Sequence, residues 1–218
     1  MKATKPRRMT DRGRKTRAAL LAAAERLFGV HGYEGTSIVD LTRAAKLALG
    51  TYYIYFPDKK TLFIELVDQL GIRLREHVAL RAGHATDRLE IERLSLLAFL
   101  EFVAEHRHLY RIVRQADFVD QKCFRRYYDR MAQPYARQLR EAAKRGEIRD
   151  GNPEVMAYCL MGVADFIGMR WGLWEKKPSP AVIAEALAFT RGGLLPQMPT
   201  SRRSPRHLAA RPAAAVAH

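Results

Sequence analysis

Apolar residues recur three and four positions apart along most of the chain, which is the spacing of one face of an α-helix. The pattern predicts helices over about residues 12–30, 49–55, 87–105, 106–115, 119–145, 153–174 and 180–191. It also predicts a helix capped by Thr36 or Ser37 and a helix that begins after Asp58 and has apolar positions as far as Leu74. No alternating run of β-branched residues with turn residues on both sides interrupts them. We therefore expect an all-α protein of about nine helices, in which three small N-terminal helices precede longer, more apolar ones.

Capping residues mark several of these helix boundaries. Ser37 offers an N-cap, and Asp40 three residues later completes a capping box. Asn152 precedes a proline at the first helical position, which is a typical helix start. Two consecutive glycines at 192–193 predict the end of the last helix.

The charge of the chain indicates its class of partner. Among 218 residues, 38 are Lys or Arg and 23 are Asp or Glu, which gives a formal net charge of +15. This excess favours a polyanionic partner, either nucleic acid or an anionic membrane surface. The alternative is a basic protein that binds nothing acidic. Hydrophobic residues make up 48% of the chain, which supplies a core and excludes wholesale disorder.

Cysteine usage and the lack of a long apolar run favour a cytoplasmic protein. Cys123 and Cys159 form neither a disulfide framework nor a metal-binding spacing, so we expect buried thiols in a reducing compartment. The basic N-terminus and the small apolar residues 18–24 resemble a signal peptide, but Glu25 and Arg26 end that run. No run approaches the ~18 apolar residues that span a bilayer, so we expect no membrane segment.

Residues 36–59 carry the pattern of a helix-turn-helix, in which a capped helix, a short turn and a second short helix follow one another. The apolar positions that pack inward are Ile38, Leu41, Ala45, Leu47, Tyr52 and Phe56. The outward positions of the second helix are Leu49, Gly50, Thr51, Tyr53 and Tyr55. This outward face carries no acid and begins with small residues, so it can enter the major groove of DNA. The alternative is a packed helical hairpin without a partner.

The stretch from Arg17 to Leu62 resembles the DNA-binding domain of the TetR family of bacterial repressors. The matching landmarks are Leu27-Phe28, Gly32-Tyr33, Thr36-Ser37-Ile38, Asp40-Leu41, the segment 50–56 and Asp58-Lys59. The resemblance implies DNA contacts from Thr36 or Ser37, Leu49, Gly50, Thr51, Tyr53, Tyr55 and Lys59. The family usually has a small residue, a glycine and a capping serine where this chain has Thr42, Lys46 and Ala48. A positive φ at Lys46 would cost about 1 kcal/mol, which a contact of its ammonium with a phosphate would offset.

Basic residues flank the motif on both sides. Lys59 begins the next helix, where its ammonium and the free backbone N–H groups can share one phosphate. Eight basic residues stand among the first 17, and such arms lie along phosphates or enter the minor groove, unless they are solvated tails. We expect a flexible basic arm over residues 1–10, a helix-turn-helix domain over 11–57, an effector-binding and dimerisation domain over 58–195 and a disordered tail over 196–218.

The last two predicted helices carry the expected dimer surface. The helix over 153–174 is apolar on two sides, so it needs two partners, although a single core face without a dimer is the alternative. The residues that would complete a four-helix contact are Ile183, Leu187, Phe189 and Thr190. One short helix-turn-helix covers few base pairs, so we expect a homodimer on a palindromic operator, with recognition helices ~34–36 Å apart.

The middle helices hold the expected effector pocket. Its candidate residues are Phe99, Phe102, Val103, Tyr110, Arg111, Arg114, Phe118, Phe124, Tyr127, Tyr128, Met131, Asp165 and Phe166, with Gln115 and Tyr135 as further members. Aromatic residues and methionines at helical spacing are alternatively ordinary core. Arg111 and Arg114 suit a carboxylate or phosphate on a lipophilic ligand, or pair with Asp117 or Glu105. The stretch 162–171 resembles regulators that sense lipophilic acids or their coenzyme A esters (acyl-CoA).

The sequence predicts a transcriptional regulator and no enzyme. His106 and His108 lack the i, i+4 spacing of helical metal ligands, and no phosphate loop or nucleophile elbow is present. We therefore expect no metal, no cofactor and no catalytic site. The leading hypothesis is a repressor dimer on double-stranded operator DNA, released by a lipophilic small-molecule effector. The alternatives are a constitutive DNA-binding protein whose helical core is only a dimerisation scaffold, and a helical enzyme or carrier with a vestigial DNA-binding motif.

Overall fold

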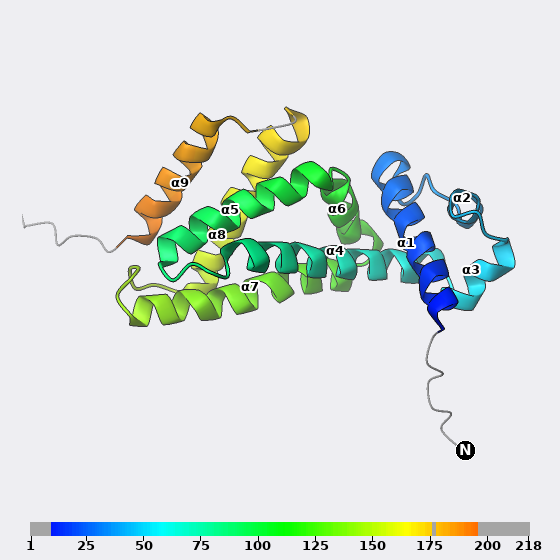
Figure 1. Ribbon diagram of the computed structural model, residues 1–218, viewed down its shortest axis with the longest axis horizontal. Coiled ribbons are helices and arrows are strands. Elements are labelled where there is room, and N and C mark those ends of the chain that lie inside the picture. The colour runs from blue at the N-terminus through cyan, green and yellow to red at the C-terminus, as the bar shows by residue number, and fades with distance from the viewer. Residues whose placement is uncertain (1–9, 176–177, 196–218) are drawn as a thin grey trace, which may run out of the picture.

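Helices account for every regular element in the computed structural model, which describes residues 10–175 and 178–195 (Figure 1). This confirms the predicted all-α fold. The described residues form α1 (Asp11–His31), α2 (Ile38–Ala44), α3 (Leu49–Tyr55), α4 (Lys59–Ala82), α5 (Arg88–Glu105), α6 (Leu109–Val119), α7 (Gln121–Lys144), α8 (Pro153–Ile167), the π-helical segment η1 (Gly168–Trp174) and α9 (Pro180–Leu194). The predicted arm over residues 1–10, except Thr10, and the predicted tail over 196–218 lie outside the described residues.

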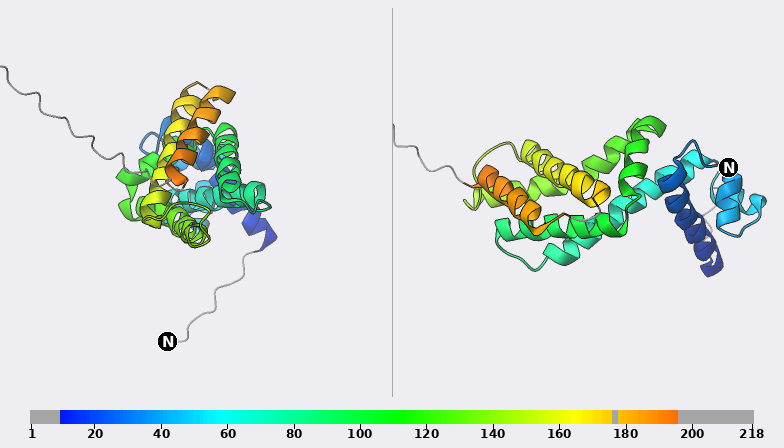
Figure 2. Two further views of the ribbon diagram at one scale, coloured as in Figure 1. Left: turned by 90° about the vertical axis from the view of Figure 1, so that its left-hand side faces the viewer. Right: turned by 90° about the horizontal axis from the view of Figure 1, so that it is seen from above.

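The first three helices form a small unit at one end of the molecule, which we call the N-terminal bundle (residues 11–55; Figure 2). Its core joins α1, α2, α3 and the start of α4 through the buried Leu20, Phe28, Leu41, Tyr52, Phe56 and Phe63. The predicted capping box is present at the start of α2. Ser37 Oγ accepts the Asp40 N–H at 3.1 Å, and the Asp40 carboxylate accepts the Ser37 N–H at 3.0 Å.

Helix α4 connects the N-terminal bundle to the rest of the molecule (Figure 1). It begins after Asp58, whose side chain accepts the Thr61 N–H at 2.6 Å. Its first turns pack against α1, and its later turns pack along α5 and α7. The ion pairs that fix α1 on this helix are Arg17–Glu65 and Glu25–Arg73. A displacement of α4 therefore moves the whole N-terminal bundle.

The remaining helices form the larger part of the molecule beside the C-terminal half of α4. Helices α5 and α7 pack along α4, and α8 packs on α7 and α5. Helix α6 lies at the junction with the N-terminal bundle, where it contacts α1, α4 and α7. Helix α9 lies at the edge of this group, against α8 and α5. In the part of the chain that the structure describes, no helix is long and apolar enough to cross a membrane.

The last helix ends later than predicted. Helix α9 continues through the glycines at 192–193 to Leu194, so the predicted stop at Arg191 is wrong. Leu194 is buried, and its carbonyl oxygen accepts the Arg149 N–H at 2.8 Å. These tertiary contacts override the weak helix propensity of glycine.

Two other helices depart from their predicted course. Helix α6 is shifted toward the C-terminus, because the backbone at His106 leaves the helical region and Asp120 caps the following helix. The helix predicted over 153–174 changes to π geometry at Gly168. A Cβ on Gly172 would lie 3.4 Å from a Val103 methyl group, so this segment packs closely on α5.

Candidate nucleic-acid interface and ligand cavity

Helix α3 presents an exposed face at the outer edge of the N-terminal bundle (Figure 1). Leu49, Tyr53 and Ile54 are 47%, 54% and 75% exposed, and α3 contains no acidic residue. A Cβ on Gly50 would meet no other described atom within 4 Å, so this position is open to an approaching surface. The face combines small, apolar and hydroxyl groups without a negative charge that would repel phosphate.

The opposite face of α3 anchors the helix. Tyr52 is fully buried, and its hydroxyl donates to the Asp58 carbonyl oxygen at 3.0 Å. Burial raises the pKa of Tyr52 far above its ordinary value, so the hydroxyl remains a donor. Thr51 and Tyr55 lie between the two faces and are half-buried. Because Tyr52 anchors the buried face of α3, the exposed face of the helix has a fixed orientation.

The turn between α2 and α3 contains the residues that depart from the family pattern. Lys46 is exposed and has a φ of 57°, which lies in the left-handed region where glycine is usual. Ala48 is the N-cap of α3 and makes no side-chain capping bond. Thr42 is buried, and its hydroxyl donates to the Val39 carbonyl oxygen at 3.0 Å. The positive φ considered for residue 46 is therefore present.

The sequence predicted a DNA contact from either Thr36 or Ser37, and only Ser37 lies at the surface. Thr36 is 1% exposed, and its hydroxyl donates to the Gly32 carbonyl oxygen at 2.8 Å. The prediction that the Thr36 side chain contacts DNA is therefore wrong. Ser37 is exposed, but its hydroxyl also caps α2 and donates to Asp40 at 2.5 Å.

The ammonium of Lys59 binds protein atoms instead of facing outward. It donates to the carbonyl oxygens of Tyr33 at 2.7 Å and Thr36 at 3.0 Å, and it lies 4.2 Å from the centroid of the Tyr33 ring. These contacts tie the start of α4 to the loop between α1 and α2. They correct the expectation that Lys59 binds phosphate and make it a positioning residue.

Sequence reasoning missed three exposed residues beside this face. Ile54 follows the outward Tyr53 and is the most exposed apolar residue of α3. Val39 and Arg43 stand four residues apart on the outer side of α2, and Arg43 makes a 3.4 Å contact with Asp40. The i, i+4 spacing of Val39 and Arg43 is the signal that could have placed them on one face.

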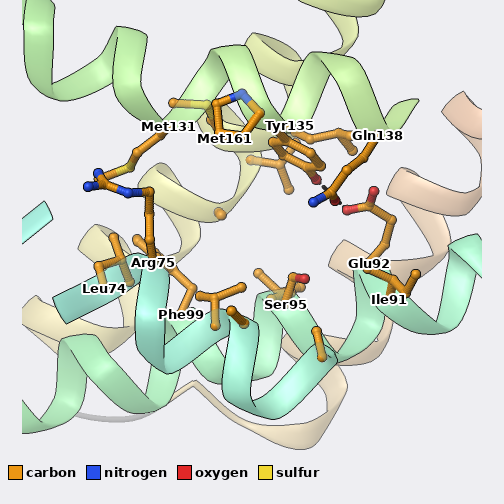
Figure 3. A pocket seen from close by; sticks show the side chains of 18 of the residues that line it. Leu74, Arg75, Ile91, Glu92, Ser95, Phe99, Met131, Tyr135, Gln138 and Met161 are labelled. Carbon is orange, nitrogen blue, oxygen red and sulfur yellow. Dashed lines mark hydrogen bonds between the residues drawn. The ribbon is translucent and has the colours of Figure 1, made fainter. Parts of the chain in front are cut away.

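A cavity of about 760 Å³ lies between α4, α5, α7, α8 and α9 (Figure 3). This volume falls within the range of small-molecule sites, about 300–1,000 Å³. The apolar residues of its walls include Leu74, Val78, Ile91, Leu96, Phe99, Met131, Leu160, Met161 and Leu187. Among the described residues, no cluster of His, Cys, Asp and Glu is arranged to hold a metal ion. The cavity suits an apolar organic molecule.

About half of the predicted pocket residues line this cavity. Those that do are Phe99, Arg114, Tyr127, Tyr128, Met131, Tyr135 and Asp165. Those that do not are Phe102, Val103, Arg111, Gln115, Phe118, Phe124 and Phe166. Phe102 and Val103 are buried in the core beside α4, whereas Phe118 is 92% exposed. The side chain of Tyr110 lies outside the described residues.

Sequence reasoning missed lining residues on every helix of the cavity wall, and α4 and α5 supply many of them. They include Leu74, Arg75, Val78, Arg88, Glu92 and Ser95. Arg88 and Glu92 stand four residues apart in the apolar α5, and an ion pair at that spacing on such a helix is the signal that could have found them.

Helix α6 joins the cavity to the N-terminal bundle. Val113 and Arg114 line the cavity. Gln115 accepts the Tyr33 N–H at 2.5 Å, and Arg111 donates to a carbonyl oxygen near the end of α1 at 3.1 Å. Arg111, predicted to bind a ligand, therefore holds α1 instead.

Apolar side chains remain exposed on one side of α8 and α9. This C-terminal face consists of Val155, Tyr158, Gly162, Phe166 and Phe189. Phe166 and Phe189 are 63% and 71% exposed, and a Cβ on Gly162 would meet no other described atom within 4 Å. Adjacent exposed apolar residues of this kind mark an interaction surface.

The two cysteines differ in burial. Cys123 is buried as predicted, and burial raises the pKa of its thiol to about 11. Cys159 is exposed on α8, which corrects the expectation that both thiols are buried. Its neighbour Tyr158 belongs to the C-terminal face.

These features define a class of protein. A short exposed helix without acids, anchored in a three-helix bundle and joined to a larger helical body, is the arrangement of a helix-turn-helix transcriptional regulator. The family model described as bacterial regulatory proteins, tetR family, matches residues 20–66. The DNA-binding part of the chain therefore matches this family, which supports a helix-turn-helix transcriptional regulator of the TetR type.

Relatives that match most of the chain are also described as helix-turn-helix (HTH) transcriptional regulators. The HTH-type transcriptional regulator YdgC of Bacillus subtilis is 24% identical over 87% of this chain and 97% of its own length. The HTH-type transcriptional regulator TtgR of Pseudomonas putida is 28% identical over 76% of this chain and 84% of its own length.

Solved structures share the fold. The fatty acid degradation regulator FadR of Bacillus halodurans matches with a TM-score of 0.71 at 19% identity, over 87% of this chain and 96% of its own. FadR of Bacillus subtilis, solved in complex with stearoyl-CoA, matches with a TM-score of 0.71 at 18% identity, over 81% of this chain and 98% of its own.

Proposed function

We propose that the protein is a ligand-responsive repressor, in which a homodimer binds a palindromic operator and a lipophilic molecule in the cavity releases it. The observation that carries this proposal is α6, which lines the cavity with Val113 and Arg114 and holds α1 with Arg111 and Gln115. A bound molecule can therefore act on the position of the N-terminal bundle. The second candidate, a constitutive DNA-binding protein with a dimerisation scaffold, gives the 760 Å³ cavity no role.

DNA binding falls to residues 11–57 in this proposal, and effector binding and dimerisation to residues 58–195. The proposed groove contacts are Leu49, Gly50, Thr51, Tyr53 and Tyr55. Small and apolar side chains allow close approach and contact thymine methyl groups, and tyrosine hydroxyls donate to phosphates. Ser37 at the start of α2 and Lys46 in the turn before α3 are assigned to the DNA backbone. A protein that binds operator DNA acts where that DNA lies, so we assign it to the cytoplasm.

A second copy of this chain covers the C-terminal face in the proposed dimer. A palindromic operator requires two copies of α3 about one helical turn apart, ~34–36 Å. The exposed Phe166 and Phe189 supply the apolar area for a self-complementary contact, and the open Gly162, one turn before Phe166 on α8, allows close approach. Leu187 and Thr190, which the sequence assigned to this contact, line the cavity instead.

The proposed effector is lipophilic because the cavity walls are mainly apolar. The charged residues that line the cavity are Arg75, Arg88, Arg114, Arg137, Arg145, Glu92, Glu141 and Asp165. Arginines outnumber acids in this set, which disfavours a cationic effector. The stearoyl-CoA bound by FadR of Bacillus subtilis, which shares the fold, supports a lipophilic acid or its coenzyme A thioester as a candidate.

Gel-shift titration of a duplex selected by the wild-type protein from a random pool tests this function. We expect Leu49→Ala to weaken binding about tenfold, because it removes an apolar groove contact. Tyr53→Phe should weaken binding about fivefold, because it removes a hydrogen bond to phosphate. Leu80→Ala is the matched control, since Leu80 is exposed near the opposite end of α4. Unchanged affinity in both α3 variants would contradict the assignment.

A further inference from the structure

One end of the cavity carries a polar cluster in which the buried Arg88 and Glu92 contact the half-buried Tyr135 and the exposed Gln138, and we call it the polar end (Figure 3). Arg88 and Glu92 are 3% and 5% exposed. Arg88 donates to Glu92 Oε1 at 2.5 Å and to Gln138 Oε1 at 3.2 Å. The Tyr135 hydroxyl donates to Glu92 Oε2, and the guanidinium of Arg88 lies 5.7 Å from the centroid of the Tyr135 ring.

The polar end retains hydrogen-bonding capacity beyond these contacts. Arg88 Nε is buried and finds no hydrogen-bond partner among the described residues. Gln138 uses its carbonyl oxygen on Arg88, which leaves its NH₂ group as a donor. Each oxygen of Glu92 can accept a second bond. Ser95, less than one turn further along α5, adds a hydroxyl to the cavity wall.

Stability alone does not account for this cluster. The cost of desolvating two charges offsets the attraction within a buried ion pair. Apolar residues of similar volume often stabilise the folded protein equally well. Burial raises the pKa of Glu92 even though Arg88 is in contact with it, so desolvation outweighs the attraction here. Because burying these charged groups costs desolvation energy, their presence in the wall of an otherwise apolar cavity indicates that they recognise a ligand.

We propose that the polar end binds an uncharged hydroxyl, carbonyl or amide group of an otherwise apolar molecule. The inference rests on the proposed function, because it assumes that the cavity holds the effector. The polar group accepts a hydrogen bond from Gln138 or Arg88, and a hydroxyl or amide also donates to Glu92. The apolar part then extends along Phe99 toward Met131, at the other end of the cavity (Figure 3).

Charge disfavours an ionic group at this end. Arg88 and Glu92 are paired with each other, so a carboxylate at this cluster would lie beside Glu92, and an ammonium beside Arg88, while the opposite charge is already engaged in the ion pair. An anionic group would instead find an excess of positive charge where Arg75 and Arg114 line the cavity with Asp165. The polar end therefore distinguishes uncharged from charged groups.

Titration calorimetry of the full-length protein at pH 7 with 1-octanol, octanoate and octylammonium tests this inference. The double variant Arg88→Met/Glu92→Leu removes both charges together, so neither remains buried and unpaired. We expect it to bind 1-octanol at least about tenfold more weakly than the wild type, and octanoate less than about threefold more weakly. Tyr135→Phe should weaken 1-octanol binding about threefold, because Glu92 loses one of its donors.

Met131→Leu is the control, because Met131 lines the end of the cavity opposite the polar end. It should weaken 1-octanol binding far less than the double variant does. Unchanged 1-octanol affinity in the double variant, or an equal loss for octanoate, overturns the inference and leaves the proposed function intact. Failure of the wild-type protein to bind any of the three probes overturns both the inference and the proposed effector site.

Discussion

Lys46 holds the turn between α2 and α3 in a left-handed backbone conformation, which costs a residue with a Cβ about 1–2 kcal/mol. Glycine avoids this strain but loses more entropy on folding. We expect Lys46→Gly to have a free energy of unfolding about 0.5–1 kcal/mol larger than that of Lys46→Ala, measured by urea denaturation. The comparison of two variants without the ammonium isolates the backbone effect. Equal free energies of unfolding would show that the turn is not strained.

Lys59 and Lys46 should differ in how they affect DNA binding. The Lys59 ammonium binds two carbonyl oxygens inside the protein, whereas Lys46 is exposed beside α3. We expect Lys59→Met to weaken binding without changing its salt dependence, because no phosphate contact is lost. Lys46→Met should reduce the slope of log K against log salt by about 0.9. Titration at several salt concentrations measures both slopes. A reduction of about 0.9 for Lys59→Met would show that the Lys59 ammonium does contact a phosphate.

Helical spacing separates buried from exposed residues where a helix is regular. It distinguishes the buried Tyr52 from its exposed neighbour Tyr53, because adjacent positions on a helix point in different directions. It could not place Thr36 or Lys59, because both bind backbone carbonyls of the loop between α1 and α2. Which loop carbonyls lie within reach depends on tertiary structure.

At the scale of helices, local capping chemistry predicted several starts, such as the Ser37–Asp40 capping box of α2 and the Asn152 cap of α8. Helix α3 begins at Leu49 and ends at Tyr55 as predicted, although its N-cap Ala48 makes no capping bond. The prediction failed for α9, where the buried Leu194 continues the helix through two glycines. A helix end that is held by a distant segment leaves no local signal in the sequence.

We expect helix α6 to couple ligand binding in the cavity to DNA binding by the N-terminal bundle. We expect Gln115→Ala to reduce the ligand-induced loss of operator affinity about five- to tenfold, because Gln115 links α6 to Tyr33. Gel shifts with and without a releasing ligand found on the wild type measure this ratio. Gln133→Ala is the control, since Gln133 is exposed on α7. Unchanged coupling in Gln115→Ala would exclude this route.

At the scale of the whole molecule, the sequence indicated a pocket but only part of its walls. Tyr127, Tyr128 and Met131 were found because α7 carries them among its aromatic residues. Leu74 and Val78 were missed because their spacing on α4 is that of ordinary core residues. Whether an apolar helix face meets a neighbour or a cavity is decided by how distant helices pack, which periodicity does not report.

The most direct test of the account is selection of duplexes from a random pool by the full-length protein, followed by native mass spectrometry of the complex. The central claim is that two copies of the exposed face of α3 bind one duplex. We expect a palindromic duplex whose half-sites are about one helical turn apart, 10–10.5 base pairs, bound by two copies of the chain. A selected duplex without two-fold symmetry, or one bound by a single copy, would contradict the account.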